Sequence, residues 1–344
     1  MVHIPLRLTL DSAALAANWS WLGRRSGGAD CGAAVKADGY GLGAREVVKR
    51  LMAAGCRDFF VATWAEAEAL TPWPAGHSLS VLHGVLPGDM EAALESPARP
   101  VLNSAGQVAR WRETGRPCDV MVDTGINRLG LSPLEVASGL LDDLPIETLM
   151  SHLACADEDK EANEAQRRAF AELAARVPAP RHSLANSAGI CLGADYAFGL
   201  TRPGLALYGG VPRREALGSI SRVVRVEAQI LQRRRIEAGA LVGYGGTFMA
   251  ERPHELAILN IGYADGYLRG FSGRGRARIG EKFAPVVGRV SMDLTAICVD
   301  EAPEVAEGDW IELDYDLPAA AAQSGLSQYE LLTGLGARFE RVWR

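Results

Sequence analysis

Residues 33–44 read Ala-Ala-Val-Lys-Ala-Asp-Gly-Tyr-Gly-Leu-Gly-Ala and form the first strand-to-loop unit of the chain. An apolar strand predicted over Cys31–Val35 ends on Lys36, and Tyr40 follows inside a glycine-rich loop. A lysine held at a strand end can place its amine in a partly dry pocket, where desolvation lowers the ammonium pKa and frees a neutral nucleophile. This stretch therefore predicts a strand that presents a reactive amine.

The other lysines of the chain offer no comparable setting. Lys49 lies on a helical stretch near other charges, Lys160 lies in Asp-Glu-Asp-Lys-Glu, and Lys282 lies in a Gly-Glu-Lys turn. All three are interpreted as solvated. Lys36 is thus the one candidate for imine chemistry with a carbonyl cofactor.

Short apolar runs alternate with longer helical patterns through residues 31–204. The predicted strands are Gly32–Ala37, Phe59–Thr63, Leu79–Gly84, Pro100–Ser104, Val120–Gly125, Thr148–Leu153, His182–Ser187 and Gly199–Gly204. Amphipathic helices are predicted between them, for example over Ala44–Ala54, which Gly55 would end, and over Glu158–Arg176. Such alternation implies parallel strands, and eight units predict an α/β fold with a TIM-like (β/α)₈ barrel. An open doubly wound sheet is the alternative, but no GxGxxG follows the first strand.

The pattern of the sequence changes after about Ser221. Short, often alternating segments punctuated by Gly, Pro and Asp predict an all-β domain. These segments are Arg222–Leu231, Leu241–Phe248, Glu255–Gly262, Ala284–Arg289, Leu294–Val299 and Trp310–Asp314. We therefore expect a barrel over residues 11–215 and a C-terminal β domain over residues 216–344, with residues 1–10 as a strand that could join either domain.

Composition narrows the class of protein. The chain of 344 residues is 48% hydrophobic and 23% charged, and its net charge of −6 comes without a long block of like charge. These values argue against nucleic acid or a membrane as a partner. The six cysteines include no CxxC, and the single H-x-x-C pair of His152 and Cys155 has no second pair, so no metal site is predicted. The N-terminus lacks a signal-peptide pattern, and we expect a cytoplasmic protein.

Polar side chains follow the predicted strands at their carboxyl ends, where barrel enzymes carry their active sites. They are Lys36 and Tyr40 after strand one, Asp123 and Arg128 after strand five, His152 after strand six, Asn186 and Ser187 after strand seven, and Arg202 and Gly204 after strand eight. Barrels often bind phosphate near strands seven and eight through backbone N–H groups and helix dipoles. A lysine nucleophile, a phosphate site and an arginine near a ring suit pyridoxal 5′-phosphate (PLP).

Eight motifs in this order carry a family resemblance. They are Val35-Lys-Ala-Asp-Gly-Tyr-Gly41, Asp123-Thr-Gly-Ile-Asn-Arg-Leu-Gly130, Ser151-His-Leu-Ala-Cys-Ala-Asp157, Ala185-Asn-Ser-Ala188, Arg202-Pro-Gly-Leu-Ala-Leu-Tyr-Gly209, Gly243-Tyr-Gly-Gly-Thr247, Ile261-Gly-Tyr-Ala-Asp-Gly266 and Gly288-Arg-Val-Ser-Met-Asp293. The chain resembles the alanine racemases, which are PLP enzymes of fold-type III, over essentially its whole length.

The resemblance implies a pair of catalytic groups. Lys36 would hold PLP as an imine and act as one acid–base group, and Tyr244 would act as the other from the opposite face of the substrate. In the family this tyrosine comes from the partner subunit, so a homodimer with a shared active site is implied. Racemisation needs such a two-sided arrangement, because one group removes the α-proton and the other delivers a proton from the far side.

The resemblance also implies binding roles. Arg202 would meet the pyridine nitrogen, His152 would pack beside the ring, and Arg128 would lie near the cofactor phenolate and the substrate carboxylate. The phosphate and its surroundings would be held by Tyr40, Asn186, Ser187, Gly204, Leu205 and Tyr329. Met292, from the other subunit, would contact the substrate carboxylate, and Tyr263 would line the approach to the site.

One departure from the family pattern bears on the substrate side. Met121 stands where many relatives carry a lysine, modified by carbon dioxide, that positions the arginine, so Arg128 must be oriented in another way. Three functions stay open: an alanine racemase that supplies D-alanine for peptidoglycan, a racemase of serine, lysine or a broad range of amino acids, and a PLP-binding barrel without turnover. The β domain with Tyr244, Met292 and Tyr329 argues against the last.

Overall fold

Short parallel strands, each followed by a helix or a tight turn, run side by side through residues 15–221, one of two units into which the chain divides. The structure, a computed structural model, describes residues 2–344. Seven strands of this unit form one parallel sheet in chain order. They are β3 (Ala33–Ala34), β4 (Asp58–Val61), β5 (Ser78–Val81), β6 (Arg99–Leu102), β7 (Cys118–Met121), β8 (Ile146–Met150) and β9 (Arg181–Ser183).

An eighth strand completes the ring. Strand β10 (Leu200–Thr201) pairs in parallel with β2 (Asp30–Cys31), which directly precedes β3. On its other side, the Gly199 amide at the start of β10 donates to the His182 carbonyl oxygen of β9 at 2.9 Å. The predicted (β/α)₈ barrel is therefore confirmed, and its strands are buried on both faces, as in β4 with four buried residues in succession.

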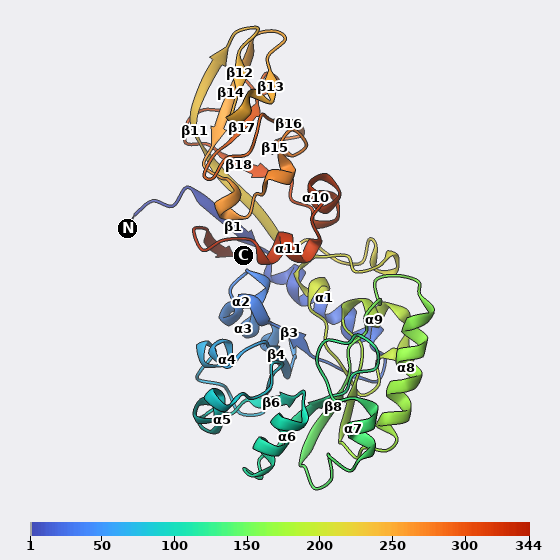
Figure 1. The fold of residues 1–344 in the computed structure, drawn as a ribbon. Helices are drawn as coiled ribbons and strands as arrows, with labels where there is room; N and C mark the ends of the chain where they lie inside the picture. Colours follow the sequence, from blue (N-terminus) through green and yellow to red (C-terminus); the bar gives the residue numbers. More distant parts are fainter. Residues whose placement is uncertain (1) are drawn as a thin grey trace. The chain divides into compact units, whose positions relative to one another are not determined.

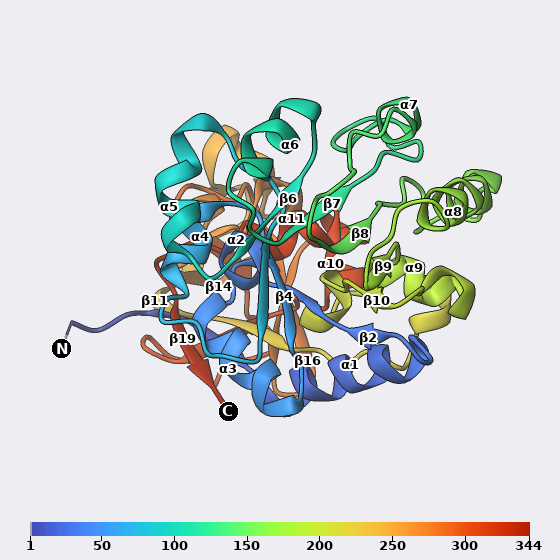
Figure 2. The same ribbon diagram turned by 90° about the horizontal axis from the view of Figure 1, so that it is seen from below.

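Helices surround these strands, as the view along the barrel in Figure 2 shows for α1, α3, α5, α6, α7 and α8. The helices are α1 (Ser12–Arg25), α2 (Lys36–Tyr40), α3 (Ala44–Ala54), α4 (Trp64–Ala69), α5 (Met90–Glu95), α6 (Ala105–Arg112), α7 (Pro133–Ala137), α8 (Glu161–Ala174) and α9 (Ser187–Leu192). The helix predicted over Ala44–Ala54 has those bounds, and Gly55 ends it in the left-handed conformation at φ 108°.

The predicted strand positions hold, but the strands end earlier than predicted. Strand β7 stops at Met121 and β9 stops at Ser183, so the polar motif residues that follow lie in loops or at helix starts. Lys36 shows the same correction, because β3 ends at Ala34 and Lys36 begins the next turn. The site residues therefore stand beyond the strand ends, on segments that the strands anchor.

The second unit comprises residues 1–14 and 222–344 and is built on an antiparallel sheet. Its strands appear in yellow to red in Figure 1, with β1 in blue. They are β11 (Val224–Ile236), β14 (His254–Leu259), β15 (Arg276–Ile279), β16 (Lys282–Val287), β17 (Thr295–Cys298), β18 (Trp310–Leu313) and, as a separate hairpin, β12 (Leu241–Val242) and β13 (Phe248–Met249). Because β14 pairs with both β17 and β11, the sheet closes on itself as a small barrel.

The beginning and the end of the described chain meet in this unit. Strand β1 (Leu6–Leu10) pairs antiparallel with β11 and parallel with β19 (Glu340–Trp343). Its alternating leucines Leu6, Leu8 and Leu10 are all buried, which fits a strand with one face on a core. Two helices, α10 (Leu317–Ser324) and α11 (Gln328–Thr333), complete the unit. Nowhere in residues 2–344 is there a helix with the length and apolar character needed to cross a bilayer.

Candidate active site

Lys36 opens a tight turn with unusual backbone geometry. The residues after it, Ala37, Asp38 and Tyr40, all have positive φ values between 52° and 55°, which is uncommon for residues with a side chain. Side chains hold the turn in place: Asp38 accepts from the Ala44 amide at 2.8 Å, and Glu66 accepts from the Ala37 amide at 2.8 Å. Strain that is fixed from several sides is typical of functional sites.

The Lys36 amine lies in a positive environment. Burial is the first cause that lowers its pKa, the charge of Arg128 adds to the shift, and that of Arg202 adds less, whereas Glu66 opposes the shift. A lowered ammonium pKa increases the fraction of neutral, nucleophilic amine at neutral pH. The lowered pKa supports the prediction of a reactive amine at Lys36.

His152 lies in the same cluster, directly after Ser151 at the end of β8. Burial, as the largest cause, and the neighbouring charges of Arg202, Arg128 and Lys36, in that order, together lower its pKa to about 3. The imidazole is therefore neutral at physiological pH. The barrel brings these four side chains together from four different strand ends, and three of them are cationic, which suits an anionic ligand.

Arg202 is buried and held by two neutral groups. Its Nη1 donates to the Ser183 hydroxyl, and its Nη2 donates to the Ser151 carbonyl oxygen at 2.5 Å. Burial lowers the guanidinium pKa to about 10, so the group stays protonated at neutral pH. A guanidinium has hydrogen-bond donors and no acceptor, so Arg202 can bind only to an acceptor atom of a ligand.

Hydroxyls and amides converge where strands seven and eight end. Ser187 is the first residue of α9, and the Asn186 side chain caps this helix by accepting from the Gly189 amide at 2.9 Å. The Ser187 hydroxyl oxygen accepts from the amides of Gly204 and Ala206, at 2.9 and 3.2 Å. Leu205 lies between them at the start of a 3₁₀ turn and is buried.

Gly204 also lies against the Tyr40 side chain. A Cβ atom at position 204 would stand 2.1 Å from the Tyr40 hydroxyl oxygen, so only glycine fits there. Tyr40 in turn stacks on Tyr208, with ring centroids 4.7 Å apart. The Tyr40 hydroxyl lies in this region. The Ser187 hydroxyl oxygen already accepts from the Gly204 and Ala206 amides, so its own proton can be donated to a phosphate monoester. These residues fit the phosphate of PLP.

The loop that carries Arg128 is fixed by the side chains of Asp123 and Gln166. The Asp123 carboxylate accepts from the amides of Gly125, Ile126 and Asn127 at 2.8 to 3.2 Å. From α8, the Gln166 side chain donates to the Thr124 hydroxyl at 3.2 Å and to the His152 carbonyl oxygen at 3.0 Å. With Met121 buried in β7, Asp123 and Gln166 are the groups that shape this loop. No sequence pattern linked Gln166, on the helix predicted over residues 158–176, to this loop, because its partner Thr124 lies 42 residues earlier in the chain.

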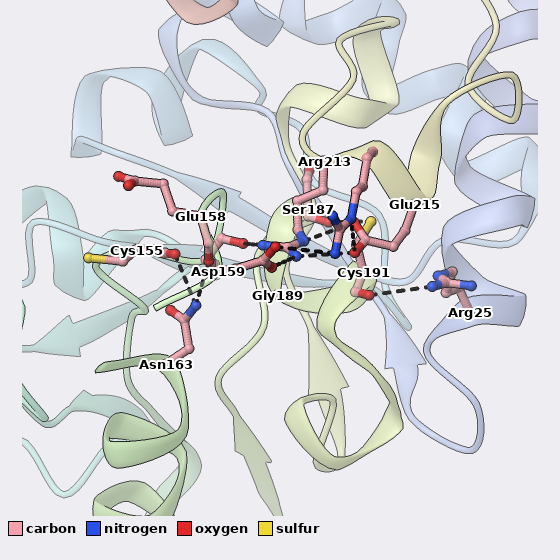
Figure 3. Close-up of polar contacts among 12 residues, drawn as sticks. Arg25, Cys155, Glu158, Asp159, Asn163, Ser187, Gly189, Cys191, Arg213 and Glu215 are labelled. Carbon is pink, nitrogen blue, oxygen red and sulfur yellow. Dashed lines mark hydrogen bonds and ion pairs between the residues drawn. The ribbon is translucent and has the colours of Figure 1, made fainter. Parts of the chain in front are cut away.

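A polar network holds the chain segments beside α9 (Figure 3). Arg213 donates to the Ala156 carbonyl oxygen at 2.9 Å and pairs with Asp159 and Glu215. Arg25 donates to the Cys191 carbonyl oxygen of α9 at 3.3 Å. The loop after His152 and the segment after the Gly204 region are thereby tied together, although the sequence analysis named none of these residues as part of the site.

The remaining candidates, Tyr244, Tyr263, Met292 and Tyr329, belong to the second unit. Tyr244 lies in the turn between β12 and β13 and has 69% of its surface exposed. Met292 is 53% exposed and Tyr329, on α11, is 44% exposed. Tyr244 lines a cavity of about 440 Å³ together with Arg289 and Ser291.

Tyr263 and Met292 are held next to each other within this unit. The Tyr263 amide donates to the Ser291 carbonyl oxygen and the Ala264 amide to the Met292 carbonyl oxygen, both at 3.0 Å. Arg338 ties the two loops together, because it donates to the buried carboxylate of Asp265 at 2.6 Å and to Asp293 at 2.8 Å. Nothing in the sequence linked Arg338 to these motifs.

Comparisons with known proteins identify the family to which the chain belongs. Residues 10–212 match the family model of the alanine racemase N-terminal domain, and residues 223–343 match that of the C-terminal domain. The chain belongs to the alanine racemase family. The alanine racemase of Acidiphilium cryptum is 46% identical to it, over 97% of this chain and 98% of the relative. Agrobacterium fabrum has a biosynthetic and a catabolic alanine racemase, each 42% identical over 98% of this chain and over 94% and 91% of the relatives.

Solved structures of alanine racemases agree with the whole chain. That from Bartonella henselae, described with covalently bound pyridoxal phosphate, has a TM-score of 0.93 at 35% identity and covers 99% of this chain and 100% of the other. The biosynthetic alanine racemase of Pseudomonas aeruginosa has a TM-score of 0.91 at 31% identity, with the same coverage. Both units of the chain thus have counterparts in one enzyme family.

Proposed function

We propose that this chain is a PLP-dependent alanine racemase, an isomerase that interconverts L-alanine and D-alanine. The observation that carries the proposal is the Lys36 amine with its lowered pKa, placed among Arg128, His152 and Arg202 in the barrel of an alanine racemase family member. Alternatives with the same chemistry on serine or lysine differ in the substrate pocket and not in these groups.

PLP would be held through its phosphate, its ring and its aldehyde carbon. The phosphate would be bound by Tyr40, Asn186, Ser187, Gly204, Leu205 and Tyr329, the ring by His152 and Arg202, and the aldehyde carbon by the amine of Lys36. When bound, the coenzyme supplies an electron-withdrawing ring system that acidifies the α-hydrogen of an attached amino acid. The convergence of two amides on the Ser187 hydroxyl supports the phosphate assignment.

Arg202 would keep the ring nitrogen unprotonated. A group that stays protonated at a pKa of about 10 can donate to that nitrogen but cannot leave a proton on it under physiological conditions. The bound ring would then withdraw electrons only moderately. This limits side reactions that need a strongly electron-poor ring, and it favours simple return of the proton to the α-carbon.

Lys36 and Tyr244 would exchange the proton at the substrate α-carbon from opposite faces. Lys36 serves as the base for one enantiomer and Tyr244 for the other, and each returns a proton when the reaction runs in reverse. Tyr244 would come from the partner subunit of a homodimer. The Tyr244 side chain is largely exposed within its own unit, so a second subunit can reach it, and this supports the placement. Arg128, Met292 and Tyr263 would hold the substrate carboxylate.

The biological role follows from the product. D-alanine would serve as a precursor for peptidoglycan, and the reaction would take place in the cytoplasm, where the amino acid pool is available. Neither nucleic acid nor a membrane is proposed as a partner, which agrees with the net charge of −6.

A screen of L-amino acids for loss of optical rotation, with PLP supplied, tests the proposal. We expect alanine to racemise fastest. Lys36→Ala should abolish the reaction and remove the absorbance band of the protonated imine, whereas Tyr244→Phe should keep the band and lose conversion in at least one direction. Faster turnover of serine or lysine would reject the substrate, and a bound coenzyme without any racemisation would reject the enzyme class.

A further inference from the structure

Three different metal-binding side chains meet in the second unit, and none of them has a role in the proposed racemase site. His254 begins β14, Cys298 ends β17, and Asp300 follows two residues later. Strands β14 and β17 are antiparallel neighbours, with Leu256 opposite Cys298, so the three side chains come to one end of the pair. The Nδ1 atom of His254, the Sγ atom of Cys298 and a carboxylate oxygen of Asp300 lie within 4.8 Å of one another.

The orientation of these groups is fixed by their surroundings. One carboxylate oxygen of Asp300 accepts from the Glu255 amide at 2.7 Å, which leaves the other, Oδ2, 2.8 Å from the His254 Nδ1 atom. The His254 ring packs edge-on against Phe248, with centroids 5.9 Å apart. Metal-binding carboxylates and imidazoles in proteins are commonly held by such outer contacts.

A Cys–His–Asp set could also be a catalytic triad, and the geometry speaks against that. In a triad the carboxylate holds one ring nitrogen while the nucleophile meets the other. Here Asp300 and Cys298 both face the same nitrogen, with the Cys298 Sγ atom 3.6 Å from Nδ1. The three donor atoms lie within 4.8 Å of one another, a spacing that a single metal ion can span.

We propose that His254, Cys298 and Asp300 bind one divalent transition-metal ion of the zinc class. A tetrahedral zinc ion with ordinary bond lengths separates a bound nitrogen and sulfur by about 3.6 Å and a bound nitrogen and oxygen by about 3.3 Å. The first separation is already present, and the second requires an opening of the Nδ1–Oδ2 pair from 2.8 Å. The three residues line a cavity of about 840 Å³, which leaves room for water as the fourth ligand.

Two cationic side chains, Arg252 and Lys282, lie near the site, and Arg252 must move away from Asp300 when a metal ion binds. Arg252 pairs with the Asp300 oxygen at 2.8 Å, but its side chain is 67% exposed and can swing into solvent. Lys282 is held by the Glu301 carbonyl oxygen instead. On binding, the Cys298 thiol proton leaves to solvent and the His254 proton moves from Nδ1 to Nε2. One proton is therefore released for each ion bound.

Titration of the full-length holoenzyme with Zn²⁺, and separately with Co²⁺, tests the site. We expect one ion per chain with a Kd in the micromolar range or tighter. Bound Co²⁺ should show the intense visible bands of a tetrahedral ion, which lie at longer wavelength than coenzyme absorption. Cys298→Ser and His254→Gln should each weaken binding by at least about 10-fold. The matched control Cys155→Ser, in the other unit, should leave both ions bound.

Arg252→Gln keeps the proposal testable if the ligand variants fold poorly. It leaves all three donors in place and removes the competing cation, so Zn²⁺ should bind a few-fold more tightly than to the unchanged protein. Binding only at millimolar Zn²⁺, a six-coordinate cobalt spectrum, or equal affinity in the Cys298→Ser variant would each overturn the proposal.

Discussion

The surroundings of His152 keep its imidazole neutral, and this lowers the stability of the folded chain at acidic pH. In the folded chain its pKa is about 3, whereas an unfolded histidine has its ordinary value near 6.5. Below that ordinary value the unfolded chain takes up a proton that the folded chain refuses, so stability contributed by neutral His152 is present above pH 6.5 and is lost as the pH falls toward 3.

We therefore predict that His152→Gln flattens the acid side of the stability profile. Relative to this variant, the unchanged protein should lose up to about 1.4 kcal/mol of unfolding free energy for each pH unit below 6.5. Urea unfolding at several pH values between 7 and 4 measures the difference. The matched control His83→Gln, at an exposed position, shows how far the substitution itself changes stability. Curves for His152→Gln that run parallel to those of the unchanged protein would contradict the prediction.

Gly204 allows a test of the contact with Tyr40. Gly204→Ala should lower the free energy of unfolding by about 1–3 kcal/mol, because the new methyl group meets the Tyr40 hydroxyl at 2.1 Å. It should also weaken PLP binding. Introduced together with Tyr40→Ala, the same change should cost much less, and a double-mutant cycle measures this coupling. Gly106→Ala, at an open helical position, should be neutral or mildly stabilising. Strict additivity in the cycle would exclude the steric explanation.

The sequence was informative about single residues where chemistry and strand ends coincide. Lys36, His152, Ser187 and Arg202 could be selected because each follows an apolar run. Gln166 and Arg338 could not be selected, because their partners lie 42 and 73 residues away in the chain. The His254–Cys298–Asp300 cluster could not be predicted for the same reason. Sequence motifs for metal sites consist of ligands at short spacings along the chain, whereas these three residues are brought together by the pairing of β14 with β17.

At the scale of elements, the turn after β14 and the loop before β17 depend on one arginine. Arg338→Gln leaves the buried Asp265 carboxylate with a single donor, the Gly262 amide at 3.0 Å. We predict a loss of about 1–3 kcal/mol of unfolding free energy and a higher KM for alanine, since the loops that carry Tyr263 and Met292 lose their common anchor. Steady-state kinetics and thermal unfolding measure the two effects. Arg278→Gln, on an exposed part of β15, is the control, and an unchanged KM for Arg338→Gln would separate these loops from substrate binding.

Most elements could be located from the sequence, and the failures have identifiable causes. The helix over Ala44–Ala54 was predictable because its apolar positions recur on one face and a glycine ends it. Strand β15 was missed because Gly273-Arg-Gly-Arg-Ala-Arg-Ile-Gly280 reads as a charged turn, although Ala277 is buried between β16 and β18. Strand β19 was missed because its partner, β1, lies more than 300 residues earlier in the chain.

At the scale of the whole molecule, a shared active site predicts complementation between inactive variants. Lys36→Ala and Tyr244→Phe should each be inactive as homodimers. Co-expressed with different affinity tags, they should form mixed dimers in which one of the two sites has both groups intact, so a random mixture recovers about a quarter of the unchanged activity. Purification on both tags leaves only mixed dimers, so their activity should reach about half of that of the unchanged dimer. No recovery would show that Lys36 and Tyr244 of one site come from the same chain.

The pairing of β1 with β19 has a consequence for how the protein is made. A ribosome releases residues 15–221 as one continuous stretch, so we expect the (β/α)₈ barrel to fold during synthesis. Residues 6–10 complete their strand pairing much later, because one edge of β1 is covered only when residues 340–343 have been synthesised. Until then one edge of this apolar strand stays unpaired, even after β11 has covered the other edge. A product that ends before residue 340 would keep this exposed edge, which favours aggregation.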